Sequence, residues 1–201
     1  QAHLVGYSMG GGAAYNLYDI DPNRIASITL LSSLGVQEFE LTGDYWLNHA
    51  IHGLQLGFFW VLNHLAPHFG ALRDIDGVPF SRNFYESDQR PLRDVMRRYD
   101  KPVLIIQGEA DGQVPPEAAR EHARIMPHSE LHMTDRGHGM VFRDHELVSG
   151  ILLPFFDKVE AGGGVLRAQA DPARIAAASE PPHAARMIGI ATFSFVLLLT
   201  L

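Results

Sequence analysis

The chain carries the pattern Gly-x-Ser-x-Gly near its start, with Ser8 at the centre. Residues 3–5 precede it as the end of an apolar strand, and residues 13–17 follow as a helix. Gly6 and Gly10 lie two positions before and after Ser8, where a Cβ would crowd a tight turn. The pattern therefore predicts a strand, a sharp turn and a helix, with Ser8 held on a strained backbone.

A serine on such a turn is suited to nucleophilic chemistry. Its hydroxyl is a weak nucleophile unless a base removes the proton and donors receive the oxyanion that forms. The backbone N–H of Met9, in the first turn of the following helix, is our candidate for such a donor. The alternative is a non-catalytic Gly-rich turn, because Gly-x-Ser-x-Gly also occurs by chance.

An acid and a base follow Ser8 in the sequence, each after a predicted strand. Residues 102–107 form a β-branched apolar run, and the polar turn after it contains Asp111. A shorter run at residues 130–133 leads into a loop that places His138 between two glycines. Both side chains are thus expected at the ends of strands, as Ser8 is.

Together, these motifs resemble the nucleophile, acid and base motifs of the α/β-hydrolase family, in the family's chain order. They are Gly-x-Ser-x-Gly at 6–10, Gly-x-x-Asp-x-x-Val-Pro at 108–115 and Gly-His-Gly at 137–139. The resemblance implies an α/β fold with a mostly parallel sheet. It assigns Ser8 as the nucleophile, His138 as the general base and then acid, and Asp111 as the carboxylate that orients His138.

Other interpretations of the charged residues remain open. Asp111 is also suited to cap a helix that begins near Pro115, and Asp135 competes with it as the partner of His138. Five further histidines are expected on surfaces or at strand ends: His3, His122, His128, His132 and His145.

A segment at about residues 36–100 interrupts the alternation of strands and helices. In the family that the chain resembles, a helical cap is inserted here over the active site. Its aromatic residues are expected either to line an apolar acyl pocket or to pack the cap onto the main domain. They are Phe39, Tyr45, Trp46, Phe58, Phe59, Trp60 and Phe69.

The two ends of the chain carry further expectations. The family places several strands before the serine turn, so we expect residues 1–160 to be an N-terminally truncated hydrolase domain. The second oxyanion donor would then lie outside the chain, and this fragment alone would be inactive. Residues 161–185 are typical of a linker, and residues 186–201, which carry no charge from residue 187 onward, are typical of the start of a transmembrane segment, truncated.

A hydrolase domain followed by such a segment resembles fusions to a DedA-type multi-span membrane protein. Arginines precede the apolar run, at positions 167, 174 and 186, and the positive-inside tendency places the hydrolase domain on the cytoplasmic side. The alternative for the run, a buried core helix, fits poorly because it has no polar face.

We therefore expect a membrane-tethered serine hydrolase that acts on a carboxylic ester or a related acyl substrate. The alternative is a non-catalytic hydrolase-like sensor or accessory module. The formal net charge of −7 argues against a nucleic-acid partner, and the absence of cysteine excludes a thiol nucleophile. The eleven histidines show no metal-ligand spacing, so we expect neither a metal nor a cofactor. The sequence does not indicate the oligomeric state.

Overall fold

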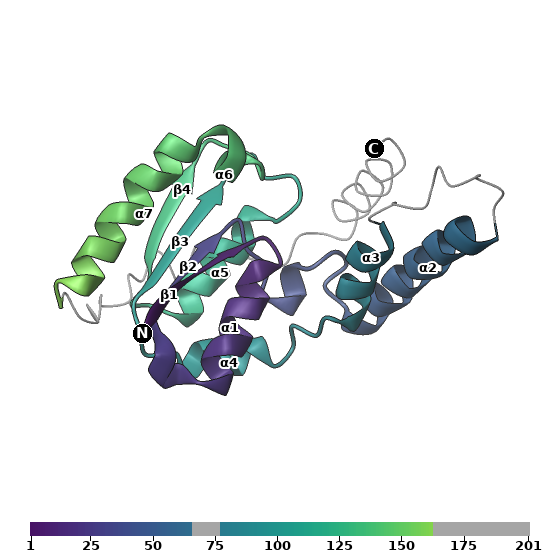
Figure 1. Ribbon diagram of the computed structural model, residues 1–201, viewed down its shortest axis with the longest axis horizontal. Helices are drawn as coiled ribbons and strands as arrows, with labels where there is room; N and C mark the ends of the chain where they lie inside the picture. Colours follow the sequence, from purple (N-terminus) through teal and green to yellow (C-terminus); the bar gives the residue numbers. More distant parts are fainter. Residues whose placement is uncertain (66–76, 163–201) are drawn as a thin grey trace.

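The apolar runs of the sequence form the strands of one sheet in the computed structural model, which describes residues 1–65 and 77–162. The strands alternate with helices along the chain (Figure 1). In order, the elements are β1 (Ala2–Tyr7), α1 (Gly10–Ile20), η1 (Pro22–Arg24), β2 (Ile25–Leu31), η2 (Gln37–Phe39), α2 (Tyr45–His64), α3 (Gly77–Glu86), α4 (Leu92–Arg98), β3 (Val103–Gly108), α5 (Pro116–Ile125), β4 (Glu130–Thr134), α6 (Met140–Arg143) and α7 (His145–Glu160).

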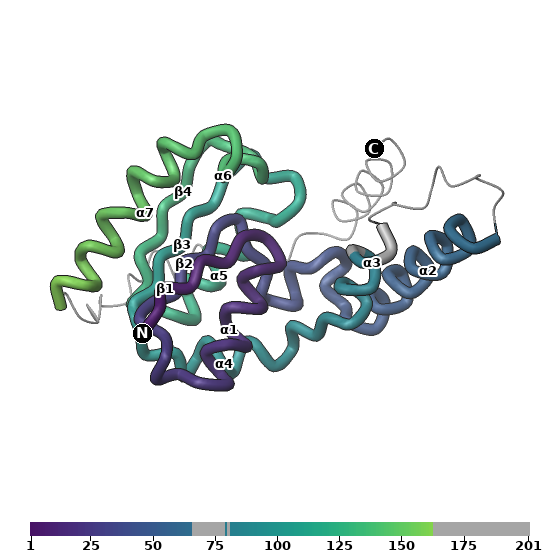
Figure 2. Tube along the Cα trace, viewed as in Figure 1, coloured from purple at the N-terminus to yellow at the C-terminus, as the bar shows by residue number. Residues whose placement is uncertain are grey.

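The four strands pair in the order β1-β2-β3-β4, and every pair is parallel. The register sets Tyr7 beside Leu31, and Leu31 beside Ile106. Because parallel strands end at one edge of the sheet, the segments that follow them gather there (Figure 2). This confirms the predicted α/β fold with a parallel sheet.

Helices cover both faces of the sheet, and two apolar clusters lie beneath them. Along β3, Val103 and Ile105 belong to the cluster under α1, α4 and α5, whereas Leu104 and Ile106 belong to the cluster under α7. This alternation follows from the two-residue period of a strand. Both faces being buried explains why β3 is a continuous apolar run in the sequence.

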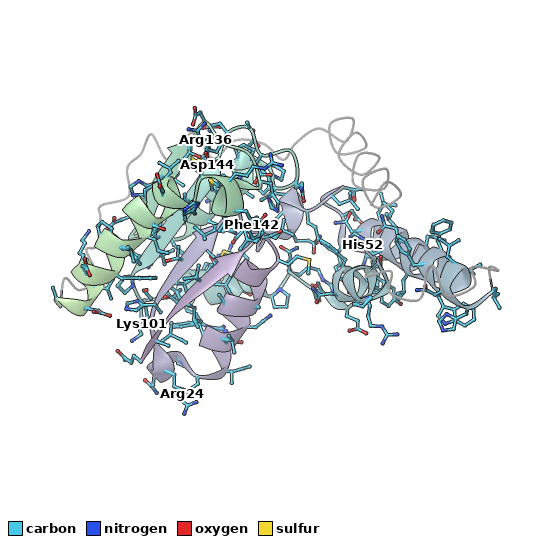
Figure 3. All side chains as sticks on the ribbon, turned by 45° about the horizontal axis from the view of Figure 1, so that its top comes forward. Arg24, His52, Lys101, Arg136, Phe142 and Asp144 are labelled. Carbon is cyan, nitrogen blue, oxygen red and sulfur yellow. The ribbon has the colours of Figure 1, made fainter. Side chains whose placement is uncertain are left out.

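The helices α2 and α3 lie to one side of the sheet (Figure 1). Asp44 caps α2, since its carboxylate accepts a hydrogen bond from the Leu47 N–H at 2.8 Å. Stacked rings join the two helices: His49 lies 4.0 Å from Tyr85, and His52 (Figure 3) lies 5.0 Å from the ring of Phe84. In contrast, α4 packs against α1, within the layer that covers the sheet.

The predicted membrane segment at 186–201 and, from residue 163, the predicted linker fall outside the described residues. Within the described part of the chain, no helix is both long enough and apolar enough to span a bilayer.

One expectation about the histidines is wrong. His122 was expected at a surface or a strand end, but it is fully buried in α5, on the face that packs against the sheet layer. His132 and His145 are exposed, as expected. The buried apolar neighbours of His122 in α5 are alanines, whose small side chains give a weak signal for the buried face of a helix.

Candidate active site

Ser8 lies on the turn between β1 and α1, at the edge of the sheet where the strands end. Its φ of 53° falls in the left-handed region, which is uncommon for a residue other than glycine. The Ser8 N–H donates to the Leu31 carbonyl at 3.0 Å, and the Ser8 carbonyl accepts from the Leu34 N–H at 3.0 Å. The segment after β2 therefore fixes the strained backbone of Ser8 from both sides.

Two glycines permit this turn: Gly6, as expected, and Gly11, which was not expected. A Cβ on Gly6 would lie 2.6 Å from the carbonyl carbon of Gly10, and one on Gly11 would lie 2.7 Å from the Leu34 carbonyl oxygen. A Cβ on Gly10 would meet nothing within 4 Å. The expectation of crowding at Gly10 is therefore wrong: its backbone, not its Cα substituent, occupies the space beside Gly6.

Asp111 and His138 form a hydrogen-bonded pair. Their Oδ2 and Nδ1 atoms lie 2.9 Å apart, and the carboxylate of Asp111 is fully buried. The Asp111 Oδ1 accepts from the N–H groups of Gln113 at 2.8 Å and Val114 at 2.9 Å, and the Gln107 amide donates to Oδ2 at 3.1 Å. The carboxylate is thus oriented by its own loop and by the end of β3.

These contacts decide the ionisation of Asp111. Burial alone would raise the pKa of this carboxyl, but the hydrogen bonds from His138, Val114 and Gln113 outweigh it and lower the pKa below its ordinary value. Asp111 is therefore an anion near neutral pH. Because a carboxylate only accepts, the Nδ1 of His138 carries the proton of their bond, and Nε2 remains available as a base.

The other interpretations of the acids do not match the geometry. The residue that precedes the first turn of α5 is Pro115, so Asp111 does not cap that helix. Asp135 is exposed and pairs with Arg136 at 3.4 Å rather than with His138.

Tyr7 joins the serine turn to the histidine loop, a role that the sequence did not suggest. Its hydroxyl donates to the His138 carbonyl at 3.1 Å, and its ring lies 5.0 Å from the imidazole. Phe142, labelled in Figure 3, packs edge-on against the ring of Tyr7, with the ring centroids 5.5 Å apart. The sequence offered one signal for this role: Tyr7 is the residue directly before Ser8, at the first variable position of Gly-x-Ser-x-Gly.

The site brings its candidate residues together to different degrees. Asp111 and His138 are in contact, and Ser8 follows the tyrosine that touches His138. Among residues 1–65 and 77–162, no hydrogen bond joins the Ser8 hydroxyl to His138.

The candidate oxyanion donor is the N–H of Met9, just before α1. It makes no backbone hydrogen bond within the same residues, so it is free to donate to an anion.

A cavity of about 450 Å³ adjoins this turn, between α1 and the segment from α3 to α4. Met9 and Phe84 line it, together with polar residues that include Glu40, Asn83 and Gln89. None of the expected aromatic residues that the structure describes lines this cavity. Of the cap aromatics that the structure describes, Phe39 and Phe59 are buried in packing, whereas Trp46 and Trp60 are exposed. Nowhere in the described ranges do three or more His, Cys, Asp or Glu side chains form a group suited to a metal ion.

The parallel sheet and the strained serine between a strand and a helix define an α/β protein of the hydrolase type. Residues 1–150 match the model of the "Alpha/beta hydrolase family", and the chain belongs to that family.

Known proteins of several activities resemble this chain. The dihydrolipoyllysine-residue acetyltransferase component of the acetoin cleaving system of Pseudomonas putida is 26% identical over 177 residues, which cover 79% of this chain and 46% of that protein. A thermophilic esterase from Thermogutta terrifontis superposes with a TM-score of 0.61 at 20% identity. A meta-cleavage product hydrolase from Pseudomonas fluorescens does so with a TM-score of 0.54, also at 20% identity. Each structure matches 79% of this chain, which spans only 65% of either.

Proposed function

We propose that the protein is a serine hydrolase of carboxylic esters or related acyl compounds. The observation that carries this proposal is the 2.9 Å bond between Asp111 and His138, at the sheet edge where Ser8 occupies its strained turn. Membership of the family and the likeness to esterase structures support the same reaction class.

In the first half of the reaction, the Ser8 hydroxyl oxygen forms a bond to the acyl carbon while His138 Nε2 takes its proton. The carbonyl oxygen becomes an oxyanion, and the Met9 N–H donates to it. When the tetrahedral intermediate collapses, the bond to the leaving alcohol breaks and the alcohol takes the proton from Nε2. The acyl group is then esterified to Ser8.

Water completes the cycle by the same route. It adds to the acyl carbon and gives a proton to Nε2, and the bond to the Ser8 oxygen then breaks as that oxygen regains the proton. In both halves the imidazole carries a positive charge for a short time. The Asp111 anion, which is buried and held by three other donors, stabilises this charge without reorganising.

The proposal extends to the location of the protein. We propose that the segment 186–201, which is uncharged from residue 187 onward, tethers the hydrolase domain to a membrane, with the domain on the cytoplasmic side, as part of a DedA-type fusion. The absence of charge from residue 187 onward and the arginines before it are the support.

A second candidate is a non-catalytic hydrolase-like module. The observation in its favour is that no hydrogen bond joins Ser8 to His138 in the described part of the chain. Catalytic hydrogen bonds in ligand-free sites are often long, so we place the enzyme first.

Labelling of the full-length protein with a fluorophosphonate probe tests the nucleophile. We expect the wild type and Ser149→Ala, a control serine in α7, to be labelled and Ser8→Ala to be unlabelled. Asp111→Asn should lower kcat on p-nitrophenyl acetate by about 10⁴. Labelling that survives in Ser8→Ala would refute the assignment. A folded wild type that neither labels nor hydrolyses esters would favour the non-catalytic module.

A further inference from the structure

The cavity beside Met9 has a one-sided charge. Three carboxylates line it, those of Glu40, Glu86 and Asp88, and its described lining includes no lysine, arginine or histidine. Asp88 is paired with Arg90, which lies outside the lining, at 2.7 Å, so Glu40 and Glu86 carry the uncompensated charge. Its neutral polar lining consists of amides and one hydroxyl, while Met9, Leu34 and Phe84 contribute apolar surface. A cavity of this composition favours a positively charged guest over an anionic one.

Glu40 is the unusual member of this lining, because it is buried. Its exposed fraction is 7%, and its Oε2 accepts from the Gln37 amide at 3.1 Å. The nearest group able to carry a positive charge is His52 of α2, with Nε2 3.9 Å from the Glu40 Oε1. Burial lowers the pKa of His52, so that imidazole is neutral near pH 7. Among the described residues, the Glu40 carboxylate therefore has no permanent counterion.

Without a permanent counterion among the described residues, the carboxyl group of Glu40 has a raised pKa. Burial raises its pKa to about 7, and the negative charge of Asp88 acts in the same direction. Hydrogen bonds from Gln37, Gln89 and Asn48 oppose the rise without cancelling it. A cation in the cavity would favour the charged form of Glu40, and the charged form would bind the cation, so each stabilises the other.

Gln89 gives a second and independent indication of a guest. It lines the cavity with an exposed fraction of 7%, and its carbonyl oxygen is buried without a hydrogen-bond partner among the described residues. Buried acceptors are nearly always paired in folded proteins, because an unpaired one loses its hydrogen bond to water without a replacement. A guest that donates a hydrogen bond to the Gln89 carbonyl oxygen would therefore satisfy this acceptor as well as the charge of Glu40.

We propose that this cavity binds an ammonium group of the substrate, with the Glu40 carboxylate as its counterion. The inference rests on the proposed hydrolase activity and deepens it, since it names the substrate class as acyl compounds that carry a positive charge. Met9 connects the two sites, because it lines the cavity and also offers the oxyanion donor next to Ser8. The ammonium group of the substrate would then lie in the cavity while its scissile carbonyl lies next to Ser8 and the Met9 N–H.

The test compares cationic esters with neutral esters of the same shape. One pair, p-nitrophenyl 6-aminohexanoate and p-nitrophenyl heptanoate, has the charge on the acyl side. The other, acetylcholine and 3,3-dimethylbutyl acetate, has it on the alcohol side. For the full-length protein, the ratio of kcat/KM, cationic over neutral, is measured in the wild type, in Glu40→Gln and in Glu38→Gln.

We expect the wild type to prefer the cationic member of at least one pair and Glu40→Gln to lower that ratio by about tenfold. Glutamine can still accept from Gln37, so the variant keeps the local packing. Glu38→Gln, an exposed carboxylate two positions away that lies outside this cavity, should leave the ratio unchanged. In the wild type the ratio should also rise from pH 6 to pH 8 as Glu40 ionises. Asp88, whose pKa is lowered by its hydrogen bond from Arg90, stays charged over this range, and His52, whose pKa is lowered by burial, is neutral in the upper half of it.

Equal ratios in wild type and Glu40→Gln for both pairs, with the neutral esters still hydrolysed, would overturn the ammonium site and leave the hydrolase intact. If the folded wild type hydrolyses none of the four esters, the proposed activity is refuted, and this inference with it.

Discussion

The buried histidine of α5 makes the stability of the protein depend on pH in a way that can be calculated. His122 is fully buried against the ring of Tyr15, and neither of its nitrogens has a hydrogen-bond partner among the described residues. Burial lowers its pKa to about 4 from the ordinary 6.5; Glu121 opposes the shift, and Arg93 adds to it. The folded state thus holds a neutral imidazole where the unfolded state accepts a proton.

The difference between the two pKa values of His122 fixes how the free energy of unfolding changes with pH. Above pH 6.5 His122 is neutral in both states and contributes no pH dependence. Between pH 6.5 and about 4 only the unfolded state binds the proton, so the free energy of unfolding falls with pH and levels off below about 4. The gap between the two pKa values corresponds to a loss of about 3 kcal/mol.

Glu40 complicates the measurement because it acts in the opposite direction. Its pKa is raised from 4.5 to about 7, so the folded state retains a proton that the unfolded state releases, and stability falls as pH rises through that interval. The wild-type curve alone would therefore hide much of the effect of His122. The difference between the wild type and His122→Leu isolates it, since Glu40 contributes equally to both.

Urea denaturation of both proteins at pH 7.5, 6, 5 and 4 gives this difference. His122→Leu should gain about 3 kcal/mol relative to the wild type between pH 7.5 and pH 4, whatever its absolute stability at pH 7.5. His132→Leu, at an exposed position of β4, is the matched control for replacing a histidine with leucine. Parallel curves for His122→Leu and the wild type would show that His122 is not held neutral in the fold.

Three further substitutions test the geometry of the serine turn. Gly6→Ala should destabilise the protein by about 1 to 3 kcal/mol in thermal denaturation, because its Cβ would meet the backbone of Gly10 at 2.6 Å, whereas Gly10→Ala should be close to neutral. Equal losses in the two variants would contradict the turn described here. Tyr7→Phe removes the hydrogen bond to the His138 carbonyl at 3.1 Å and should lower kcat on p-nitrophenyl acetate by up to tenfold with KM unchanged. A change confined to KM would show that Tyr7 acts in binding rather than in positioning His138.

The local sequence predicted most of the sheet and the site because the relevant signals are short-range. An apolar run such as Val103–Gly108 indicates a buried strand by itself, and the turn that holds Asp111 is built by hydrogen bonds to residues two and three positions away. Parallel strands then carry Ser8, Asp111 and His138 to one edge without further information.

What the sequence did not predict depends on contacts between distant segments. The crowding at Gly11 comes from residues that follow β2, and the bond from Tyr7 spans 131 positions. The polar cavity likewise depends on η2, α1 and the segment before α4 meeting in space, so the pattern of aromatic residues in the cap pointed to a different lining.

The anchoring of Asp111 has a consequence for how such a protein can diversify. Every described residue that hydrogen-bonds to Asp111 or His138 belongs to β1, β3 or the loops after β3 and β4, and none comes from residues 36–100. The acid–base pair is therefore mechanically separate from the helices that frame the cavity. New cavity linings can be grafted or selected in that segment while the proton-transfer pair stays in place, so substrate preference can change without rebuilding the chemistry.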